Sequence, residues 1–310
     1  MDLVRRVLLA ASRSAWLQRH ATERFFVKRG VRRFMPGEAL DDALKALDAL
    51  AQQGLAGVLT ELGESVSEPA MADAAARDYE DALARVHARG LDCDISVKLT
   101  HLGHDIDPER CLERVRSLVT RAAANRRFVW IDMEQHSYVD STLRAYRQLV
   151  AEFQNVGVCL QAYLYRTADD LSSLIGLGGG VRLVKGAYRE PPTVAYPRKR
   201  DVDDHYLALV DRMLSAEARG AGLRAVFGTH DRRMIEGVQA LGAAASIPTD
   251  AFEFHMLYGI RTAEQVRLVS EGYRVRVLIS YGAQWFPWYM RRLAERPANL
   301  LFAARAVFSR

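Results

Sequence analysis

Two adjacent arginines near the end of the chain are the residues whose spacing most directly indicates chemistry. Glu295 follows Arg291 and Arg292 by four and three residues, so on a helix its carboxylate can pair with either guanidinium. Guanidinium forks bind carboxylates through two hydrogen bonds at a time, and burying them without partners is costly. An aromatic run at 285–289 would line the site with apolar side chains. The pattern favours a clamp for the acid group of a ligand over the alternative, a solvated helix face.

Two lysines offer a competing chemistry. Lys98 lies in the segment SVKL and Lys185 in VKGAY, and each follows an apolar run. A lysine whose pKa is lowered by desolvation can form a Schiff base with a carbonyl substrate, as in an aldolase. Lys98 could equally be a third cation for a substrate acid, and the glycine and alanine after Lys185 suit the close approach of a large ligand. Both interpretations stay open at this point.

Eight short apolar or β-branched runs must position these side chains. The predicted strands are 57–62, 93–99, 128–133, 156–163, 181–184, 224–227, 252–256 and 275–280. They alternate with helical patterns, which predicts a parallel sheet, and eight such units close a (βα)8 barrel. An open doubly wound sheet is the second choice. We expect one catalytic domain over 1–310, with helices in 1–54, among them 38–53 ended by Gly54, and the barrel in 55–310.

Polar side chains follow nearly every predicted strand. In a (βα)8 barrel the chemistry lies at the C-terminal ends of the strands, so these side chains would converge on one rim. The residues are Glu61, Glu64, Lys98, Asp132, Glu134, Gln161, Arg182, Lys185, Thr229, His230, His255 and Tyr281. Any one of them could simply cap a helix or pair with a neighbour, but the whole set indicates a ligand site at that rim.

The composition excludes several classes of protein. With 310 residues, 49% hydrophobic and 26% charged, the chain is neither disordered nor fibrous. The net charge of +5 comes from interspersed residues, so we expect no nucleic-acid partner. The three cysteines are widely spaced and no apolar run approaches the roughly 20 residues that span a bilayer, so we expect a cytoplasmic protein. His101 and His104 have metal-like spacing without matching ligands, so we expect a solvent loop and no metal.

The chain resembles the proline dehydrogenase family in its short, monofunctional bacterial form. The resemblance rests on the ordered motifs SVKL, IDMEQ, LQAY, VRLVKGAYREPPTVAYP, GTHD, FEFHMLYG and MRRLAERPAN, and it extends from about residue 57 to the C-terminus. Members are flavoenzymes on a distorted (βα)8 barrel that oxidise L-proline to Δ1-pyrroline-5-carboxylate by hydride transfer to flavin N5. The resemblance therefore implies FAD as cofactor and a membrane quinone as electron acceptor, and it leaves peripheral contact with the inner face of the membrane open.

The resemblance also assigns roles at the substrate. Asp132 and Arg182 match the residues treated as catalytic, and Arg182 would lie near the flavin ring. The implied substrate-binding residues are Lys98, Leu257, Leu278, Arg291, Arg292 and Glu295, of which the three cations would hold the carboxylate. Glu64 matches an acidic residue that gates the pocket by pairing with the first arginine.

The implied FAD contacts are Met133, Gln161, Arg182, Lys185, Gly186, Ala187, Tyr188, Thr229 and His230. One departure bears on the substrate: the last strand of the family usually carries a tyrosine against the substrate ring, in a segment like VRVYVPYG, where this chain has VRVLISYG with Leu278. Leucine keeps the apolar contact but lacks the hydroxyl and the flat face. Hydroxyproline or another cyclic amino acid is therefore an alternative substrate. A Schiff-base lyase and a catalytically silent, acid-binding barrel are the alternatives of another class.

Overall fold

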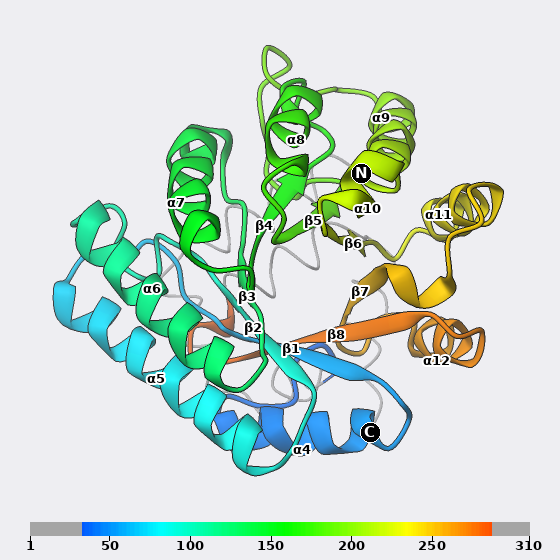
Figure 1. The fold of residues 1–310 in the computed structure, drawn as a ribbon. Coiled ribbons are helices and arrows are strands. Elements are labelled where there is room, and N and C mark those ends of the chain that lie inside the picture. Colours follow the sequence, from blue (N-terminus) through cyan, green and yellow to red (C-terminus); the bar gives the residue numbers. More distant parts are fainter. Residues whose placement is uncertain (1–32, 287–310) are drawn as a thin grey trace, which may run out of the picture.

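The computed structural model describes residues 33–286, and at its centre is a closed barrel of eight parallel strands (Figure 1). The strands are β1 (Ala56–Glu61), β2 (Cys93–Val97), β3 (Val129–Ile131), β4 (Val156–Gln161), β5 (Gly180–Val184), β6 (Arg224–Gly228), β7 (Glu253–Leu257) and β8 (Arg274–Tyr281). Each pairs with the next, and β8 closes the barrel on β1 with Leu278 opposite Val58. The predicted (βα)8 barrel is confirmed, and the open sheet is excluded.

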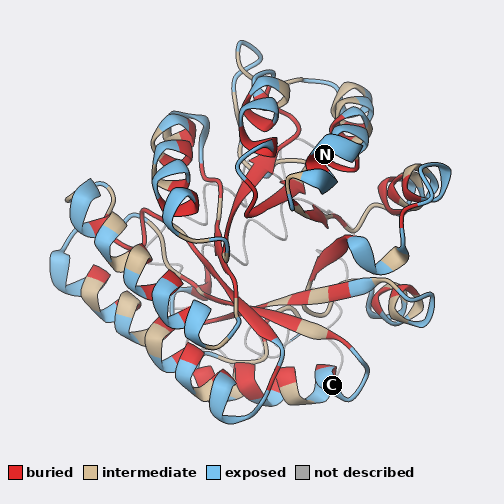
Figure 2. Ribbon diagram, viewed as in Figure 1, coloured by how far each residue is buried: buried red, intermediate tan, exposed pale blue. Residues whose placement is uncertain are grey.

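Helices surround the barrel and turn their buried faces toward it (Figure 2). They are α4 (Leu40–Ala51), α5 (Pro69–Ala88), α6 (Pro108–Ala124), α7 (Val139–Glu152), α8 (Thr167–Ile175), α9 (Lys199–Met213), α10 (Ala216–Gly220), α11 (Arg232–Ala244) and α12 (Thr262–Ser270), with 3-10 turns η1 (His136–Tyr138) and η2 (Thr249–Ala251). In α4, Leu40, Leu44 and Leu47 are buried at helical spacing, which confirms the helix predicted there. It ends before Gly54, whose φ of +75° suits glycine.

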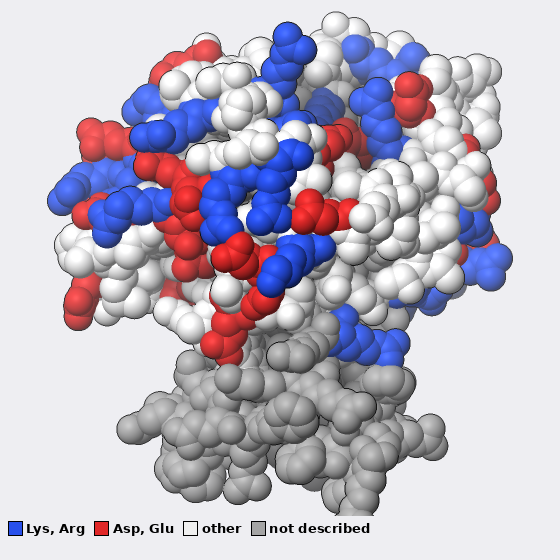
Figure 3. Space-filling view, turned by 90° about the horizontal axis from the view of Figure 1, so that it is seen from below, with Lys and Arg blue, Asp and Glu red and all other residues white. Residues whose placement is uncertain are grey.

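Two sets of predictions lie outside the described residues. The helices expected in 1–32 precede them, and the arginine pair Arg291 and Arg292 with Glu295 follows them. No helix between residues 33 and 286 is long and apolar enough to cross a membrane. On the face seen in Figure 3, acidic and basic side chains are intermixed and form no continuous patch of one sign.

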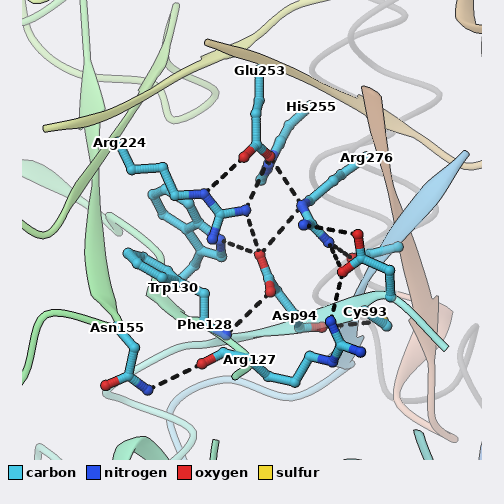
Figure 4. A network of polar contacts seen from close by, with 12 residues as sticks. Cys93, Asp94, Arg127, Phe128, Trp130, Asn155, Arg224, Glu253, His255 and Arg276 are labelled. Atoms are coloured by element: carbon cyan, nitrogen blue, oxygen red, sulfur yellow. Dashed lines mark hydrogen bonds and ion pairs between the residues drawn. The ribbon is translucent and has the colours of Figure 1, made fainter. Parts of the chain in front are cut away.

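Ion pairs, and not only branched apolar side chains, fill the N-terminal half of the barrel (Figure 4). We call this set the floor network: Asp92, Asp94, Arg127, Arg224, Glu253 and Arg276. Arg224 Nη2 donates to Asp94 Oδ2 at 2.8 Å, and Arg224 Nε and Arg276 Nε each donate to Glu253 at 2.9 Å. Because each buried charge has a partner of opposite sign, the network can sit inside the barrel.

Trp130 separates the floor network from the upper half of the barrel. The Arg224 guanidinium lies 5.3 Å from the Trp130 ring and the Arg182 guanidinium also lies 5.3 Å from it. Contacts of this length are within the range of a cation–π interaction. The ring is fully buried, and its Nε1 donates to Asp94 Oδ2 at 3.3 Å.

Candidate active site

Asp132 and Arg182 meet inside the barrel above Trp130. Asp132 directly follows β3, and Arg182 is on β5. Arg182 Nη2 donates to Asp132 Oδ1 and, at 2.9 Å, to Ser96 Oγ, which itself donates to Asp132 Oδ1 at 2.9 Å. Arg182 is only 4% exposed, and burial opposes its charge, but the Asp132 carboxylate keeps its pKa above the ordinary value. The pair predicted to be catalytic is thus a hydrogen-bonded ion pair in which Arg182 is buried and Asp132 is half-buried.

Lys98 adds a second cation to this pair. Lys98 Nζ lies 3.9 Å from Asp132 Oδ2, so the carboxylate sits between the lysine and Arg182. Arg182 already binds this carboxylate, and the 3.9 Å contact of Lys98 with it is long for an ion pair, so the ammonium can still bind the acid group of a ligand.

Two leucines form an apolar wall beside these charges. Leu257 on β7 and Leu278 on β8 are opposite each other in the strand register, so their side chains share one face of the sheet. Leu278 packs against an apolar cluster inside the barrel that includes Val58 and Trp130. Both leucines are half-buried, so part of each side chain is accessible to a ligand. The predicted pair of substrate-ring contacts is brought together.

Gln161, at the end of β4, presents a side-chain acceptor that has no hydrogen-bond partner among residues 33–286. Its Nε2 donates to the carbonyl oxygens of Met133 and Glu134, at 3.0 and 2.8 Å, which fixes the amide. Its Oε1 is buried and accepts no hydrogen bond from the described residues. The Nη1 of Arg182 is likewise a buried donor without a partner in this part of the chain. They are two of nine buried side-chain atoms without partners in this range, and they belong to predicted cofactor residues, so a polar ligand there would satisfy both.

The VKGAY segment continues this side of the site. Lys185 Nζ forms ion pairs with Asp203 and, at 2.7 Å, with Asp231 Oδ2. Gly186 has a φ of +110°, and a Cβ there would lie 2.3 Å from the Tyr163 ring. Only glycine fits, and the reason is packing on Tyr163 as well as the backbone conformation. Ala187 after it is exposed, and Tyr188 is half-buried.

Thr229 and His230 are held at the end of β6. The hydroxyl oxygen of Thr229 accepts from the Asp231 amide at 3.1 Å, and His230 Nε2 accepts from the Leu257 amide at 2.7 Å. The second contact links a predicted cofactor residue to a predicted substrate residue. The two halves of the expected site are therefore connected through one hydrogen bond.

Three residues predicted for the rim do not line it. The Tyr281 hydroxyl donates to Asp78 of α5, so Tyr281 faces the helix layer and cannot replace the missing tyrosine. Glu61 faces the same layer, where burial and then the Asp78 carboxyl raise its pKa to about 8. His255 lies deeper, edge-on to Trp130 at 5.4 Å, and burial lowers its pKa to about 4.

The prediction of a solvent loop at 101–107 holds for Asp105 and Ile106, which are exposed, but not for His101. The His101 ring is buried against Gly63, where a Cβ would lie 2.1 Å from its Nε2. Within residues 33–286, no group of three His, Cys, Asp or Glu side chains could hold a metal ion.

Sequence analysis missed Ser96 and Trp130. Each lies two residues before a predicted site residue, Lys98 or Asp132, and so on the same face of its strand. That period of two is the signal that could have found them.

Comparison with known proteins places the chain in a family. The family model for proline dehydrogenase matches residues 43–305. The chain is 37% identical to proline dehydrogenase 1 of Bacillus subtilis subsp. natto, over 99% of this chain and 100% of that protein. It is 42% identical to the proline dehydrogenase of Deinococcus radiodurans, over 89% of each chain. The chain therefore belongs to the proline dehydrogenase family, a class of enzymes that oxidise proline.

A solved structure agrees with this assignment. Proline utilization A of Bdellovibrio bacteriovorus, crystallised after inactivation by N-propargylglycine, matches with a TM-score of 0.80 and 25% identity. The match covers 87% of this chain and 33% of the longer protein, so the chain spans about a third of that relative.

Proposed function

We propose that this protein is an FAD-dependent dehydrogenase that oxidises L-proline to Δ1-pyrroline-5-carboxylate. The observation that carries the proposal is the ion pair of Asp132 with the buried Arg182 inside the barrel, with Lys98 beside it and the Leu257 and Leu278 wall on neighbouring strands. Cations suit the carboxylate of an amino acid, and the leucines suit an apolar ring. Family membership favours proline as the acid that carries both.

The unpartnered polar atoms fit a flavin. An isoalloxazine ring offers an N–H donor for Gln161 Oε1 and acceptors for Arg182 Nη1, two of the nine buried side-chain atoms left without partners in the described part of the chain. The residues that would hold FAD are Met133, Gln161, Arg182, Lys185, Gly186, Ala187, Tyr188, Thr229 and His230. When bound there, FAD would supply the hydride acceptor at flavin N5.

The side chains of the protein orient the substrate. Lys98 would bind the carboxylate together with Arg291 and Arg292, which Glu295 would steady. Leu257 and Leu278 would place the ring, and Asp132 holds the Arg182 guanidinium in a fixed, charged state. Correct placement of reacting groups can supply several kcal/mol of a barrier. Glu64 would close the pocket by pairing with Arg291.

The surroundings of Leu278 favour proline over hydroxyproline. Leu278 packs against the apolar cluster of Val58, Phe128, Trp130 and Val226, so a ring hydroxyl next to it would lose water without gaining a partner. The Schiff-base alternative loses support at Lys185, because two carboxylates already hold its nitrogen. Lys98 could still form such a bond, and borohydride trapping of a substrate on Lys98 would favour the lyase.

A quinone acceptor, a cytoplasmic location with peripheral membrane contact, and a single catalytic unit over 1–310 also belong to this proposal. The three cysteines are free and buried, which suits a reducing compartment.

Anaerobic titration with cyclic amino acids tests the proposal. Protein loaded with FAD should be yellow, and proline should bleach its flavin bands more completely than trans-4-hydroxyproline or pipecolate at equal concentration. N-propargylglycine, the inactivator named for the Bdellovibrio relative, should abolish the response to proline. Protein that cannot be loaded with FAD, or flavin that no cyclic amino acid reduces, would favour the silent barrel.

A further inference from the structure

The loop after β1 carries Glu64, and the turn after β2 fixes its backbone on both sides of this residue. The Ser65 amide donates to Thr100 Oγ1 at 3.1 Å, and the Val66 amide donates to the Thr100 carbonyl at 3.2 Å. On the other side, Gly63 lies against the His101 ring without room for a Cβ. Residues 63–66, which we call the acidic loop, are therefore placed by residues 100 and 101.

Thr100 is held in turn by the carboxylate of Glu134. The Thr100 amide donates to Glu134 Oε1 at 3.2 Å, and Thr100 Oγ1 donates to Glu134 Oε2 at 2.7 Å. The Thr100 hydroxyl oxygen accepts from the Ser65 amide, and its single proton is donated to Glu134. Thr100 and Glu134 are both buried, so water does not compete for these bonds. The result is a directional chain from Ser65 through Thr100 to Glu134.

The far end of this chain is the cofactor side of the site. The main-chain oxygen of Glu134 accepts from Gln161 Nε2, the amide whose Oε1 has no partner in the described range 33–286. Lys98 is two residues before Thr100 on the same segment. Thr100 and Glu134 thus connect the acidic loop, the substrate cation and the residue expected under the flavin.

We propose that Thr100 and Glu134 are positioning residues that lock the acidic loop, and with it Glu64, to the strand ends carrying Lys98 and Gln161. The effect on substrate binding rests on the proposed function, because it takes Glu64 as the gate. The placement of the loop does not depend on that function.

Substitution of Thr100 separates the hydroxyl from the shape of the side chain. Thr100→Val keeps the shape and both main-chain hydrogen bonds but removes the acceptor for the Ser65 amide, whereas Thr100→Ser keeps the hydroxyl. In the flavin-loaded protein, hydrogen exchange of the Ser65 amide should be about 3- to 10-fold faster in Thr100→Val, the range expected for one lost hydrogen bond. Thr100→Ser should stay near the wild-type rate.

The kinetic effect should be confined to substrate binding. In Thr100→Val, KM for proline should rise about 3- to 10-fold while kcat and flavin content stay close to wild type, and Thr100→Ser should restore KM. Glu134→Gln is a second variant, because its amide has one acceptor oxygen and can no longer accept from the Thr100 amide and the Thr100 hydroxyl on two separate oxygens. It should shift exchange and KM in the same direction as Thr100→Val.

Wild-type exchange at Ser65 in folded Thr100→Val and Glu134→Gln would overturn the positioning role. Faster exchange with an unchanged KM would overturn the link from the loop to the substrate. If the wild-type protein oxidises no cyclic amino acid, the proposed function fails, and the exchange measurements still decide whether these residues place the loop.

Discussion

Substitution of Asp94 by asparagine tests whether the floor network stabilises the N-terminal half of the barrel. Asp94 is 2% exposed, and its carboxylate accepts from the Phe128 amide at 3.1 Å, from Trp130 Nε1 at 3.3 Å and from Arg224 Nη2 at 2.8 Å. Arg276 Nε lies a further 3.5 Å from it. Asp94→Asn keeps the size of the side chain, but it turns one acceptor into a donor among donors and removes the negative charge.

The size of the effect follows from the charge balance. In the floor network, Asp92, Asp94 and Glu253 face Arg127, Arg224 and Arg276, so the substitution leaves one cation uncompensated. Removing one partner of a buried ion pair costs about 3–5 kcal/mol. We expect the free energy of unfolding to fall by that amount.

Urea denaturation followed by circular dichroism at neutral pH measures this loss. The matched control is Asp48→Asn, because the Asp48 side chain is 43% exposed and pairs with Arg89 at a similar distance, 2.8 Å. An exposed pair contributes less than about 1 kcal/mol, so the control should remain near wild type. If Asp94→Asn lost no more stability than Asp48→Asn, the floor network would not be what holds this half of the barrel.

Three further predictions concern the site and its surroundings. Arg182→Lys keeps the charge but loses the fork that reaches Ser96 and Asp132, so kcat/KM for proline should fall about 10- to 150-fold; an unchanged value in steady-state assays would remove Arg182 from the reaction. Leu278→Tyr should raise kcat/KM for proline and change its ratio to that for hydroxyproline by about 10-fold, and an unaltered ratio would show that this position does not set ring preference. Between pH 4.5, the ordinary pKa of a glutamate, and about pH 8, Glu61 keeps its proton in the folded protein and loses it in the unfolded chain. The free energy of unfolding should therefore fall as pH rises through this window. The stability of Glu61→Gln relative to wild type should therefore be higher at pH 9 than at pH 5, by about 3 kcal/mol in urea titrations. Parallel pH profiles of the two proteins would contradict the raised pKa of Glu61.

The barrel was predictable because its strands are short apolar runs separated by strongly periodic helices. All eight strands lie where the sequence predicted them, although several are shorter. The third was expected over 128–133 and is observed as Val129–Ile131, yet the Asp132 amide still donates to the Val97 carbonyl. The difference is therefore one of boundary and not of pairing.

The direction of each side chain was harder to predict. A position at the C-terminal end of a strand does not show whether the side chain faces the barrel interior or the helix layer. Glu61 and Tyr281 end β1 and β8 in register, and both face the helix layer, whereas Leu278 faces inward. Alternation along each strand would have separated them. The pairing of Asp94 with Arg224, 130 residues apart, needed the closed barrel and could not be read from local pattern.

The indole of Trp130 has one guanidinium on the side of the reaction and another on the side of the scaffold. Arg182 of the candidate site and Arg224 of the floor network therefore contact the same side chain. A substitution that loosens the packing beneath the Trp130 ring also shifts the Arg182 guanidinium above it. Substitutions in the N-terminal half of the barrel therefore also affect the candidate active site. Variants of the floor network that are selected only for higher stability are expected to show altered turnover, even though none of the substituted residues contacts the substrate.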